Sequence, residues 1–374
     1  MRIDIVLRIL WTAGAQKLAI EETKRLSKLG HDVRLVFLRG SPLGGYSDLL
    51  ESVNYVILSN DGNSFLSPLF QYLTRAFFPD RGVESRVDLN LLIKYPFWAR
   101  QNMPDLVICH DQWAGFSGLL SNALYGIPYI VYLHERPPSY EIPLLGRLAR
   151  IWEGAVLGRA ARVEAVTSKV AESYSSHQSI DPVPNWVGMD GGKSRYALPQ
   201  PKEIIAVSMW DYGRKPTLYL DLLQEIPEYS LNMVGRWRIP ALKSEFVKRM
   251  QELNLTGRVR LYEGISESTL YDLYDRSRFA MRFGFGEYGM GTLVEAMSRG
   301  LPVIVNNDLG IAPIIRAHNA GLVLSDIDPK TIREFIKQAE HADVYGLLVN
   351  NVRELTKKYT WDRHCQLLLG DVVK

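Results

Sequence analysis

The sequence RFGFGEYGMGTLVEAMSRGLPVIVNN, from Arg282 to Asn307, is the most informative stretch of the chain. It passes from an apolar strand pattern through a glycine-rich loop into an apolar helix pattern, and a second strand pattern follows. Two acids stand in it with seven residues between them, Glu287 in the loop and Glu295 about one turn into the helix. A strand, a glycine-rich loop and a helix in this order are typical of nucleotide-binding α/β proteins.

The start of this helix is suited to an anion such as a diphosphate, because its N–H groups have no partner within the helix. Glycine lets the backbone approach such a ligand closely. The residues expected to bind the diphosphate here are Gly289, Met290, Gly291 and Thr292. A carboxylate one turn further on can accept hydrogen bonds from two sugar hydroxyls, so we expect Glu295 to bind a ribose. Glu287 would then lie beside the group that the diphosphate carries, unless both acids are simply solvated.

Composition and charge exclude several classes of protein. The 374 residues predict two domains, and 47% hydrophobic with 23% charged residues is ordinary for a globular protein. The net charge of +3 comes from scattered basic residues, so no nucleic-acid partner is expected. Cys109 and Cys365 are far apart in the chain, which favours neither a disulfide framework nor a zinc site. We expect a cytoplasmic protein with neither a signal peptide nor a spanning helix.

Strand and helix patterns alternate along the chain. Strand patterns at 2–10 and 31–38 flank a helix pattern, and together they form a βαβ unit. Short apolar strands between helices imply parallel sheets that are buried on both faces. We therefore predict two Rossmann-like, doubly wound domains, 1–185 and 203–355, joined by a linker at 186–202 that is rich in proline and glycine. Two such sheets would face a central cleft, where these folds bind ligands.

The stretch Glu287–Val305 resembles the E-x7-E signature of the retaining glycosyltransferases of family 4, which have the two-domain GT-B fold. The other segments that resemble this family are AGAQKLAIEETKRLSKLGHDV, PDLVICHD, GIPYIVYLHE, VPNWVGMD, WDYGRKP and YTWDRHCQLLL. The resemblance covers nearly the whole chain. It implies that the segment 356–374 crosses back to the N-terminal domain, which would bind the acceptor, while the C-terminal domain would bind a nucleotide-sugar.

The resemblance also implies roles for individual residues. The expected catalytic residues are Glu287, Arg214, Lys215 and His134, of which His134 stands at the sugar-contacting histidine of the family. The expected donor-binding residues are Glu295, Gly289, Met290, Gly291, Thr292, Gly235 and Arg282. The expected acceptor-side residues are Gly14, Ala15, Gln16 and His110, although His110 equally fits the start of an ordinary loop. Glu22 falls among the apolar positions of its helix, which indicates either a buried polar partner or local exposure of the helix.

One departure from the family pattern concerns phosphate binding. Met209 stands where relatives carry an arginine, and Arg214 occupies the position of the family's lysine, with Lys215 beside it. A diphosphate in a partly dry site needs cations, because an unpaired buried charge is costly. Arg214, Lys215 and Arg282 are therefore expected to supply them. Ala13 in the glycine loop and the order EYGMG after Glu287 are further departures.

We expect a retaining glycosyltransferase that needs no metal and no cofactor and moves a sugar from a nucleoside-diphosphate-sugar to a sugar or lipid-linked acceptor. Asp326 and Asp328 form an Asp-x-Asp pair, a pattern that binds a metal ion in a different glycosyltransferase fold. Here a helix cap at Asp328, with Pro329 at the first helical position, explains the pair more simply than a metal site. Two alternatives stay open: a sugar-nucleotide epimerase with the same fold, and a non-catalytic partner subunit, which the uncharged Met209 suggests.

Two segments leave open whether the protein touches a membrane. The segment 142–163 mixes apolar and arginine residues at helical spacing, and 63–80 is rich in aromatic residues. A basic amphipathic helix can lie on an anionic membrane surface. Both segments equally fit core-facing helices of the N-terminal domain, so a peripheral membrane contact at the inner face of the membrane remains one of two interpretations.

Overall fold

The computed structural model describes residues 1–11, 14–40, 45–59, 89–137, 143–174, 180–182, 199, 201–284 and 291–370. The chain divides into two compact units, which we call unit 1 and unit 2. Unit 1 consists of Met1–Asn185 and Trp361–Lys374, and unit 2 of Trp186–Thr360. The last segment of the chain therefore folds with the first half. Its helix begins at Trp361, five residues later than the expected segment boundary at 356, because the preceding helix runs on to Thr356.

Unit 1 is built on a parallel sheet whose described strands follow the order β3-β2-β1-β4-β5-β6-β7. The strands are β1 (Arg2–Ile9), β2 (Asp32–Arg39), β3 (Tyr55–Ile57), β4 (Leu106–His110), β5 (Tyr129–Leu133), β6 (Arg162–Ala165) and β7 (Asp181–Pro182). The helices are α1 (Gly14–Lys28), α2 (Ser47–Leu50), α4 (Leu89–Asn102), α5 (Gln112–Tyr125), α6 (Pro143–Arg159), α7 (Ser168–Ser173) and α15 (Trp361–Leu369). The central strands β4 and β5 are buried along their whole length, as continuous apolar strands predict.

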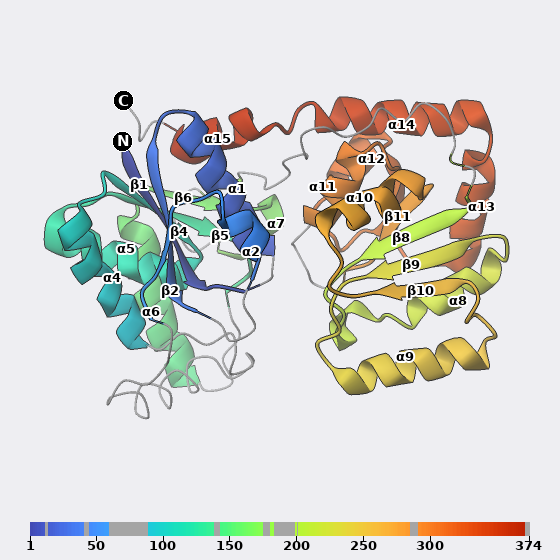
Figure 1. Cartoon of the computed structure of the whole chain (residues 1–374), viewed down its shortest axis with the longest axis horizontal. Helices are drawn as coiled ribbons and strands as arrows, with labels where there is room; N and C mark the ends of the chain where they lie inside the picture. The colour runs from blue at the N-terminus through green and yellow to red at the C-terminus, as the bar shows by residue number, and fades with distance from the viewer. Residues whose placement is uncertain are drawn as a thin grey trace. The chain divides into compact units, whose positions relative to one another are not determined.

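Helices cover both faces of this sheet (Figure 1). On one face α4 packs on α5, and α5 packs on α6. On the other face α1 packs against β2 and also against α15, the helix from the far end of the chain. This layering places the first turn of α1 at the carboxyl end of β1, because the connection from β1 to α1 is short.

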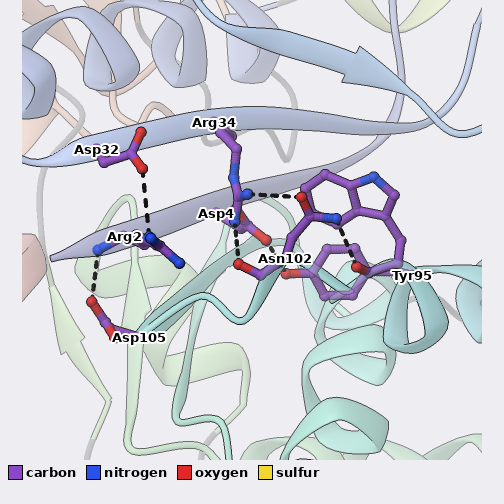
Figure 2. A network of polar contacts seen from close by, with 8 residues as sticks. Arg2, Asp4, Asp32, Arg34, Tyr95, Asn102 and Asp105 are labelled. Carbon is purple, nitrogen blue, oxygen red and sulfur yellow. Dashed lines mark hydrogen bonds and ion pairs between the residues drawn. The ribbon is translucent and has the colours of Figure 1, made fainter. Parts of the chain in front are cut away.

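A polar network shown in Figure 2 fastens β1, β2 and α4 together. Asp4 on β1 is completely buried, and it accepts hydrogen bonds from Arg34 Nε at 2.9 Å and from the Tyr95 hydroxyl at 2.8 Å. Arg34 also donates to Asn102 Oδ1 at 3.1 Å and lies over the ring of Trp98. Burial raises the pKa of Asp4. The network lies near the amino end of β1, so it stabilises the fold away from the carboxyl ends of the strands.

Unit 2 is built on a second parallel sheet, with described strands in the order β10-β9-β8-β11-β12-β13. The strands are β8 (Glu203–Val207), β9 (Ser230–Val234), β10 (Val259–Tyr262), β11 (Phe279–Arg282), β12 (Val303–Asn306) and β13 (Gly321–Leu324). The helices are η2, a 3-10 turn (Tyr212–Arg214), α8 (Leu218–Glu225), α9 (Pro240–Glu252), α10 (Glu267–Arg276), α11 (Gly291–Ser298), α12 (Ala312–His318), α13 (Pro329–Ala339) and α14 (Ala342–Thr356).

Side chains along the strands of unit 2 point alternately to the two faces of the sheet, and each face carries its own hydrophobic core. Ile204 and Ala206 of β8 belong to the core that contains α8, α9 and α13. Ile205, which lies between them, belongs to the core that contains α10, α11 and α12. Successive side chains of a strand point to opposite faces, so each apolar strand supplies both cores. The two doubly wound parallel sheets predicted from the sequence are therefore confirmed.

Candidate functional site

The residues expected to form the site divide between the two units. Unit 1 contains Gly14, Ala15, Gln16, His110 and His134, and unit 2 contains Arg214, Lys215, Gly235, Arg282, Gly291, Thr292 and Glu295. Glu287, Gly289 and Met290 lie outside the described residues. The site is therefore described unit by unit.

In unit 2, Arg282 connects two strand ends with the start of a helix. It is the last residue of β11 and is only 7% exposed. Its Nη1 donates a hydrogen bond to Thr292 Oγ1 at 2.8 Å, in the first turn of α11. Thr292 Oγ1 in turn donates to the carbonyl oxygen of Val207 at the end of β8, at 3.2 Å. These bonds place a guanidinium beside the amino end of α11, where the helix also favours negative charge.

Arg214 carries a second positive charge into the surroundings of Arg282. It is the last residue of η2, which follows β8, the neighbour of β11 in the sheet. Burial and the nearby charge of Arg282 lower the pKa of Arg214 to about 10. Burial likewise lowers the pKa of Arg282. Two guanidinium groups of like charge that are withdrawn from water are poised to bind an anion, because an anion relieves both penalties.

Lys215 differs from its neighbour Arg214 in both exposure and backbone conformation. Its side chain is exposed, and its backbone is left-handed, with a φ of 44°. Its N–H closes η2 by donating to the carbonyl oxygen of Tyr212 at 3.2 Å. Such a conformation is uncommon for a residue other than glycine. Of the two adjacent cations predicted from the sequence, only Arg214 is half-buried in the surroundings of Arg282.

Glu295 lies one turn into α11 and is half-buried. The Tyr274 hydroxyl can donate to the Thr292 carbonyl oxygen, at 3.1 Å, or to Glu295 Oε2, at 3.4 Å. Burial, and then the charge of Glu295, raises the pKa of Tyr274 well above its usual range. Tyr274 on α10 therefore contacts the carboxylate of Glu295 beside the first turn of α11. The alternative from the sequence, in which Glu295 is simply a solvated residue of the helix, does not fit its partial burial and its contact with Tyr274.

Gly235 has a structural reason to be glycine. It follows β9 with a φ of +124°, and a Cβ added there would lie 1.8 Å from the carbonyl oxygen of Ser208. No side chain fits such a distance. At Gly291, by contrast, an added Cβ would meet none of the described residues within 4 Å. The fold itself therefore requires glycine at 235 but not at 291.

Two residues that hold the entrance to the Glu287 loop were not identified from the sequence. Asn306 at the end of β12 accepts a hydrogen bond from the N–H of Gly284 at 2.9 Å and donates to its carbonyl oxygen at 2.8 Å. The Tyr219 hydroxyl accepts from the N–H of Phe283 at 3.0 Å. The one available signal was the polar Asn306 directly after an apolar strand.

In unit 1, four ionisable side chains meet at the carboxyl ends of β4 and β5. His110 ends β4 and His134 directly follows β5, and His110 Nδ1 lies 2.9 Å from His134 Nε2. On its other side His110 Nε2 lies 2.8 Å from Glu22 Oε2 on α1. The second oxygen of Glu22 lies 2.7 Å from Nε2 of His364 on α15. Glu22 is therefore buried against polar partners, one of the two interpretations that its position in the sequence allowed.

Burial and mutual charge determine the protonation of this cluster. Despite the opposing effect of burial, the two histidines hold the pKa of Glu22 at about 2. Burial and the neighbouring His110 lower the pKa of His134 to about 3. The ring of Tyr132 packs edge-on against His110 and also contacts the rings of His134 and His364. At neutral pH the cluster thus contains an ionised Glu22 and a neutral His134.

The other residues expected on the acceptor side lie at the first turn of α1. Gln16 is buried, and its Nε2 donates to the carbonyl oxygen of Ile9 at 3.1 Å, which ties α1 to the end of β1. Its Oε1 is buried without a hydrogen-bond partner among the described residues. Gly14 is exposed, and an added Cβ would meet nothing within 4 Å. Ala15 follows it in a partly exposed position.

Helix α6 lies in the segment 142–163, for which the sequence allowed either a core-facing helix or a helix on a membrane surface. Val156 and Leu157 are buried, so the helix does face the core. On its outer side, however, Leu148 is 46% exposed and Ile151 is 71% exposed. Arginines flank these two residues on the same outer side, namely the exposed Arg147, Arg150 and Arg159. The segment 63–80 lies outside the described residues.

Neither a metal cluster nor a spanning helix is found in the described part of the chain. No group of three or more His, Cys, Asp or Glu side chains there is arranged to hold a metal ion. Asp328 caps α13 by accepting from the N–H groups of Lys330 and Thr331, as the sequence predicted. Of the helices in the described ranges, none has the length and apolar character needed to cross a membrane.

Two family models match the sequence. A model described as Glycosyltransferase Family 4 matches residues 12–190. This range covers most of the first segment of unit 1, which ends at Asn185, and the first residues of unit 2. A model described as Glycosyl transferases group 1 matches residues 199–358, within unit 2. A comparison with curated protein sequences found no match.

Solved structures share the fold over the full length of the chain. HepE of Anabaena in complex with UDP-glucose has a TM-score of 0.76 at 14% identity, covering 100% of this chain and 99% of that chain. A glycosyltransferase of Rickettsia africae has a TM-score of 0.75 at 14% identity, with 99% of both chains covered. A sucrose-phosphate synthase of Thermosynechococcus elongatus has a TM-score of 0.72 at 15% identity, covering 99% and 98%.

Proposed function

We propose that this chain, which belongs to the glycosyltransferases of the GT-B fold, transfers a sugar from a nucleoside-diphosphate-sugar to a hydroxyl acceptor. One observation carries the proposal more than any other. The buried guanidinium of Arg282 lies beside the amino end of α11 in unit 2, and the half-buried Arg214 lies close enough to feel its charge. A diphosphate is the ligand that this arrangement fits, because it carries charge to match both cations and the helix start.

The same residues would serve the chemical step as well as binding. Negative charge on the leaving diphosphate is greatest in the transition state, so cations placed beforehand stabilise that state most. Arg282 is held in place by Thr292, which limits the reorganisation needed during the reaction. Glu295 would accept the ribose hydroxyls, and the complex of HepE with UDP-glucose makes a UDP-sugar the first donor to test.

The resemblance to family 4 supports retention of configuration, with the acceptor attacking from the face that the diphosphate leaves. Side-chain cations in place of a metal support a reaction that survives an excess of chelator. A requirement for magnesium or manganese that Asp326→Ala abolishes would contradict this part of the proposal. The epimerase alternative predicts turnover of the donor without an acceptor, and the non-catalytic alternative predicts nucleotide binding without turnover.

The test of the donor site begins with a thermal-shift panel of nucleotide-sugars, because a ligand that binds the native state raises its stability by mass action. Glu295→Ala should then weaken binding of the matching nucleoside diphosphate by about 1–3 kcal/mol, measured by titration calorimetry. Glu252→Ala, which removes an exposed acid from α9, is the matched control and should leave the affinity unchanged. Unchanged affinity in Glu295→Ala would overturn the ribose assignment.

We further propose that the acceptor is lipid-linked and that α6 rests on an anionic membrane surface. Leu148 and Ile151 lie exposed on the outer side of α6, with Arg147 and Arg150 beside them. In the same layer of helices α4 exposes Phe97 by 60%. Apolar side chains among arginines fit the boundary between headgroups and acyl chains, where each basic residue contributes about 1 kcal/mol on an anionic surface.

Vesicle co-sedimentation tests this contact. The protein should bind vesicles of phosphatidylcholine with phosphatidylglycerol, and it should bind vesicles of phosphatidylcholine alone far less. Replacing Arg147 and Arg150 by Gln should lower the affinity roughly tenfold or more. The matched control replaces Lys248 and Lys337, two exposed cations of unit 2, in the same way. Equal loss in both double variants would show a general charge effect and contradict a specific α6 surface.

A further inference from the structure

The loops that follow β8 and β9 continue the pairing of these two strands. Val207 and Val234 are partners at the strand ends, and three residues further on Trp210 and Trp237 are bridged. Between them the N–H of Trp210 donates to the carbonyl oxygen of Arg236 at 2.8 Å. The two loops therefore extend the sheet in register beyond its carboxyl edge.

This register makes Met209 and Arg236 neighbours, one position before the bridged tryptophans. Trp210 and Trp237 both belong to the core that contains α8 and α9. Successive side chains of an extended chain point to opposite faces, so Met209 and Arg236 leave the sheet on the other face. That is the face covered by α11.

The pair on the other side of the tryptophans shows that register partners meet on this face. Asp211 and Arg238 lie one position beyond the bridge, and Arg238 Nη1 lies 3.5 Å from Asp211 Oδ2. Arg238 thus has an acid as its partner. Arg236 has none: it is exposed, and within the described part of the chain its side chain forms no hydrogen bond and no ion pair.

The first turn of α11 lies over the end of β8, within reach of Arg236. Thr292 Oγ1 donates to the carbonyl oxygen of Val207 at 3.2 Å and accepts from Arg282 Nη1 at 2.8 Å. Arg236 is two residues along and one strand across from Val207, a separation of roughly 8 Å between Cα atoms. The extended side chain of an arginine spans most of this distance, so its guanidinium can reach a ligand at the helix start.

Charge and chemistry indicate what this guanidinium binds. Glu263, the acid that follows β10 on the other side of β9, already has Lys243 Nζ as its partner. An arginine offers a fork of N–H donors that fits two oxygens of one phosphate, and such charge-assisted bonds are among the strongest in proteins. An anion bound by Arg214 and Arg282 at the start of α11 therefore lies where Arg236 adds a further contact.

We propose that Arg236 is a third guanidinium of the donor site and binds the diphosphate from the strand next to the one that carries Met209. This inference rests on the proposed function, because the diphosphate is the ligand proposed for Arg214 and Arg282. A cation at 236 supplies the charge that the apolar side chain at 209 does not. The uncharged Met209 is therefore by itself no sign of a non-catalytic subunit.

Titration calorimetry with UDP, GDP and ADP measures the contribution of Arg236. Arg236→Gln should lower the affinity for the nucleoside diphosphate that the wild type binds by about tenfold or more, as for lost hydrogen bonds to a charged group. Its thermal unfolding midpoint should not change, because the side chain is exposed. Arg249→Gln, which removes an exposed arginine from the last turn of α9, is the matched control and should keep the affinity of the wild type.

Exchange of the two register partners separates a role in binding from a role in folding. Adding Met209→Arg to Arg236→Met should restore most of the lost affinity, because the two positions lie about 5 Å apart on one face. Failure of this restoration, or unchanged affinity in Arg236→Gln, would overturn the role of Arg236. If Arg214→Ala still weakens binding in that case, the proposed function stands. If the wild type binds none of the three diphosphates, the proposed function fails and the role of Arg236 fails with it.

Discussion

The buried charges of the two units are balanced in opposite ways. In unit 1 the negative Glu22 lies between two histidines, whose Nε2 atoms are 2.8 Å and 2.7 Å from its oxygens. In unit 2 Arg214 and Arg282 bear like charge, and burial together with the charge of Arg282 lowers the pKa of Arg214 to about 10. The buried charge of unit 1 thus has oppositely polarised neighbours within the fold, whereas the like charges of unit 2 gain most from a negatively charged ligand.

This difference matters for what each cluster does. A matched cluster is rigid and determines which atoms a ligand meets, because each hydrogen bond constrains the next. In a cluster of like positive charge the groups repel one another, and a negatively charged ligand relieves this repulsion. Such a cluster is therefore suited to stabilise a leaving diphosphate. Three changes to the protein would break or sharpen the comparison.

The largest effect is expected from a methyl group at Gly235. Gly235→Ala would bring Cβ to 1.8 Å from the Ser208 carbonyl oxygen at a φ of +124°, so unit 2 should lose roughly 3 kcal/mol or more of stability or fail to fold. Gly14→Ala in unit 1 meets nothing within 4 Å and should unfold like the wild type. Circular dichroism during thermal unfolding measures both. A stable Gly235→Ala protein would show that this strand end adjusts more than its geometry suggests.

The next effect concerns the like-charged pair. Arg214→Ala should lower kcat/KM by more than about 2 kcal/mol in transition-state stabilisation, since the charge on the leaving group is greatest there. Lys215→Ala, next to it but exposed, should cost less. Initial rates with one fixed donor measure both variants, and Arg282→Ala alone and in pairs completes the set. Near-normal kcat/KM in all three single variants would favour the non-catalytic alternative.

The smallest effect concerns the matched cluster and pH. His134 has a pKa of about 3 in the folded protein against an ordinary 6.5, so below pH 6.5 the unfolded chain takes up a proton that the folded protein does not. Stability should therefore fall with decreasing pH, by up to about 1.4 kcal/mol per pH unit below 6.5. Glu22 adds to the loss below its ordinary 4.5, because its folded pKa is about 2.

Comparison with His134→Gln isolates this effect. Burial raises the pKa of Glu153 to about 7, and this carboxyl acts in the opposite sense between pH 4.5 and 7 in both proteins. Thermal unfolding midpoints from pH 7.5 to 5 should fall more steeply for the wild type than for His134→Gln. Parallel curves would show that His134 takes up its proton in the folded protein as readily as in the unfolded chain.

The order of the strands and helices was accessible from local patterns. Apolar runs such as that of β5, which Gly126 and Pro128 precede, predict buried parallel strands, because both faces of such a strand need apolar side chains. The helix cap at Asp328 was predictable for a similar reason, since a cap depends on the next three residues alone. The placement of Glu295 one turn into a helix that follows a strand was likewise predictable from spacing, whereas that of Arg214 came from the resemblance to family 4.

The partners of these side chains were not predictable in this way, because they are far apart in the sequence and meet only through the order of the strands. Glu22 stood out as a polar residue among apolar positions, but nothing local connects it with His364, which α15 brings to it. The proximity of Arg214 and Arg282 follows from β8 and β11 being neighbours in the sheet. Gly235 is required by the carbonyl oxygen of Ser208 on the adjacent strand end, a distance that arises only when the two strands pair. Local chemistry thus determined which residues are capable of a role, and packing between distant segments determined their partners and the environment of their charges.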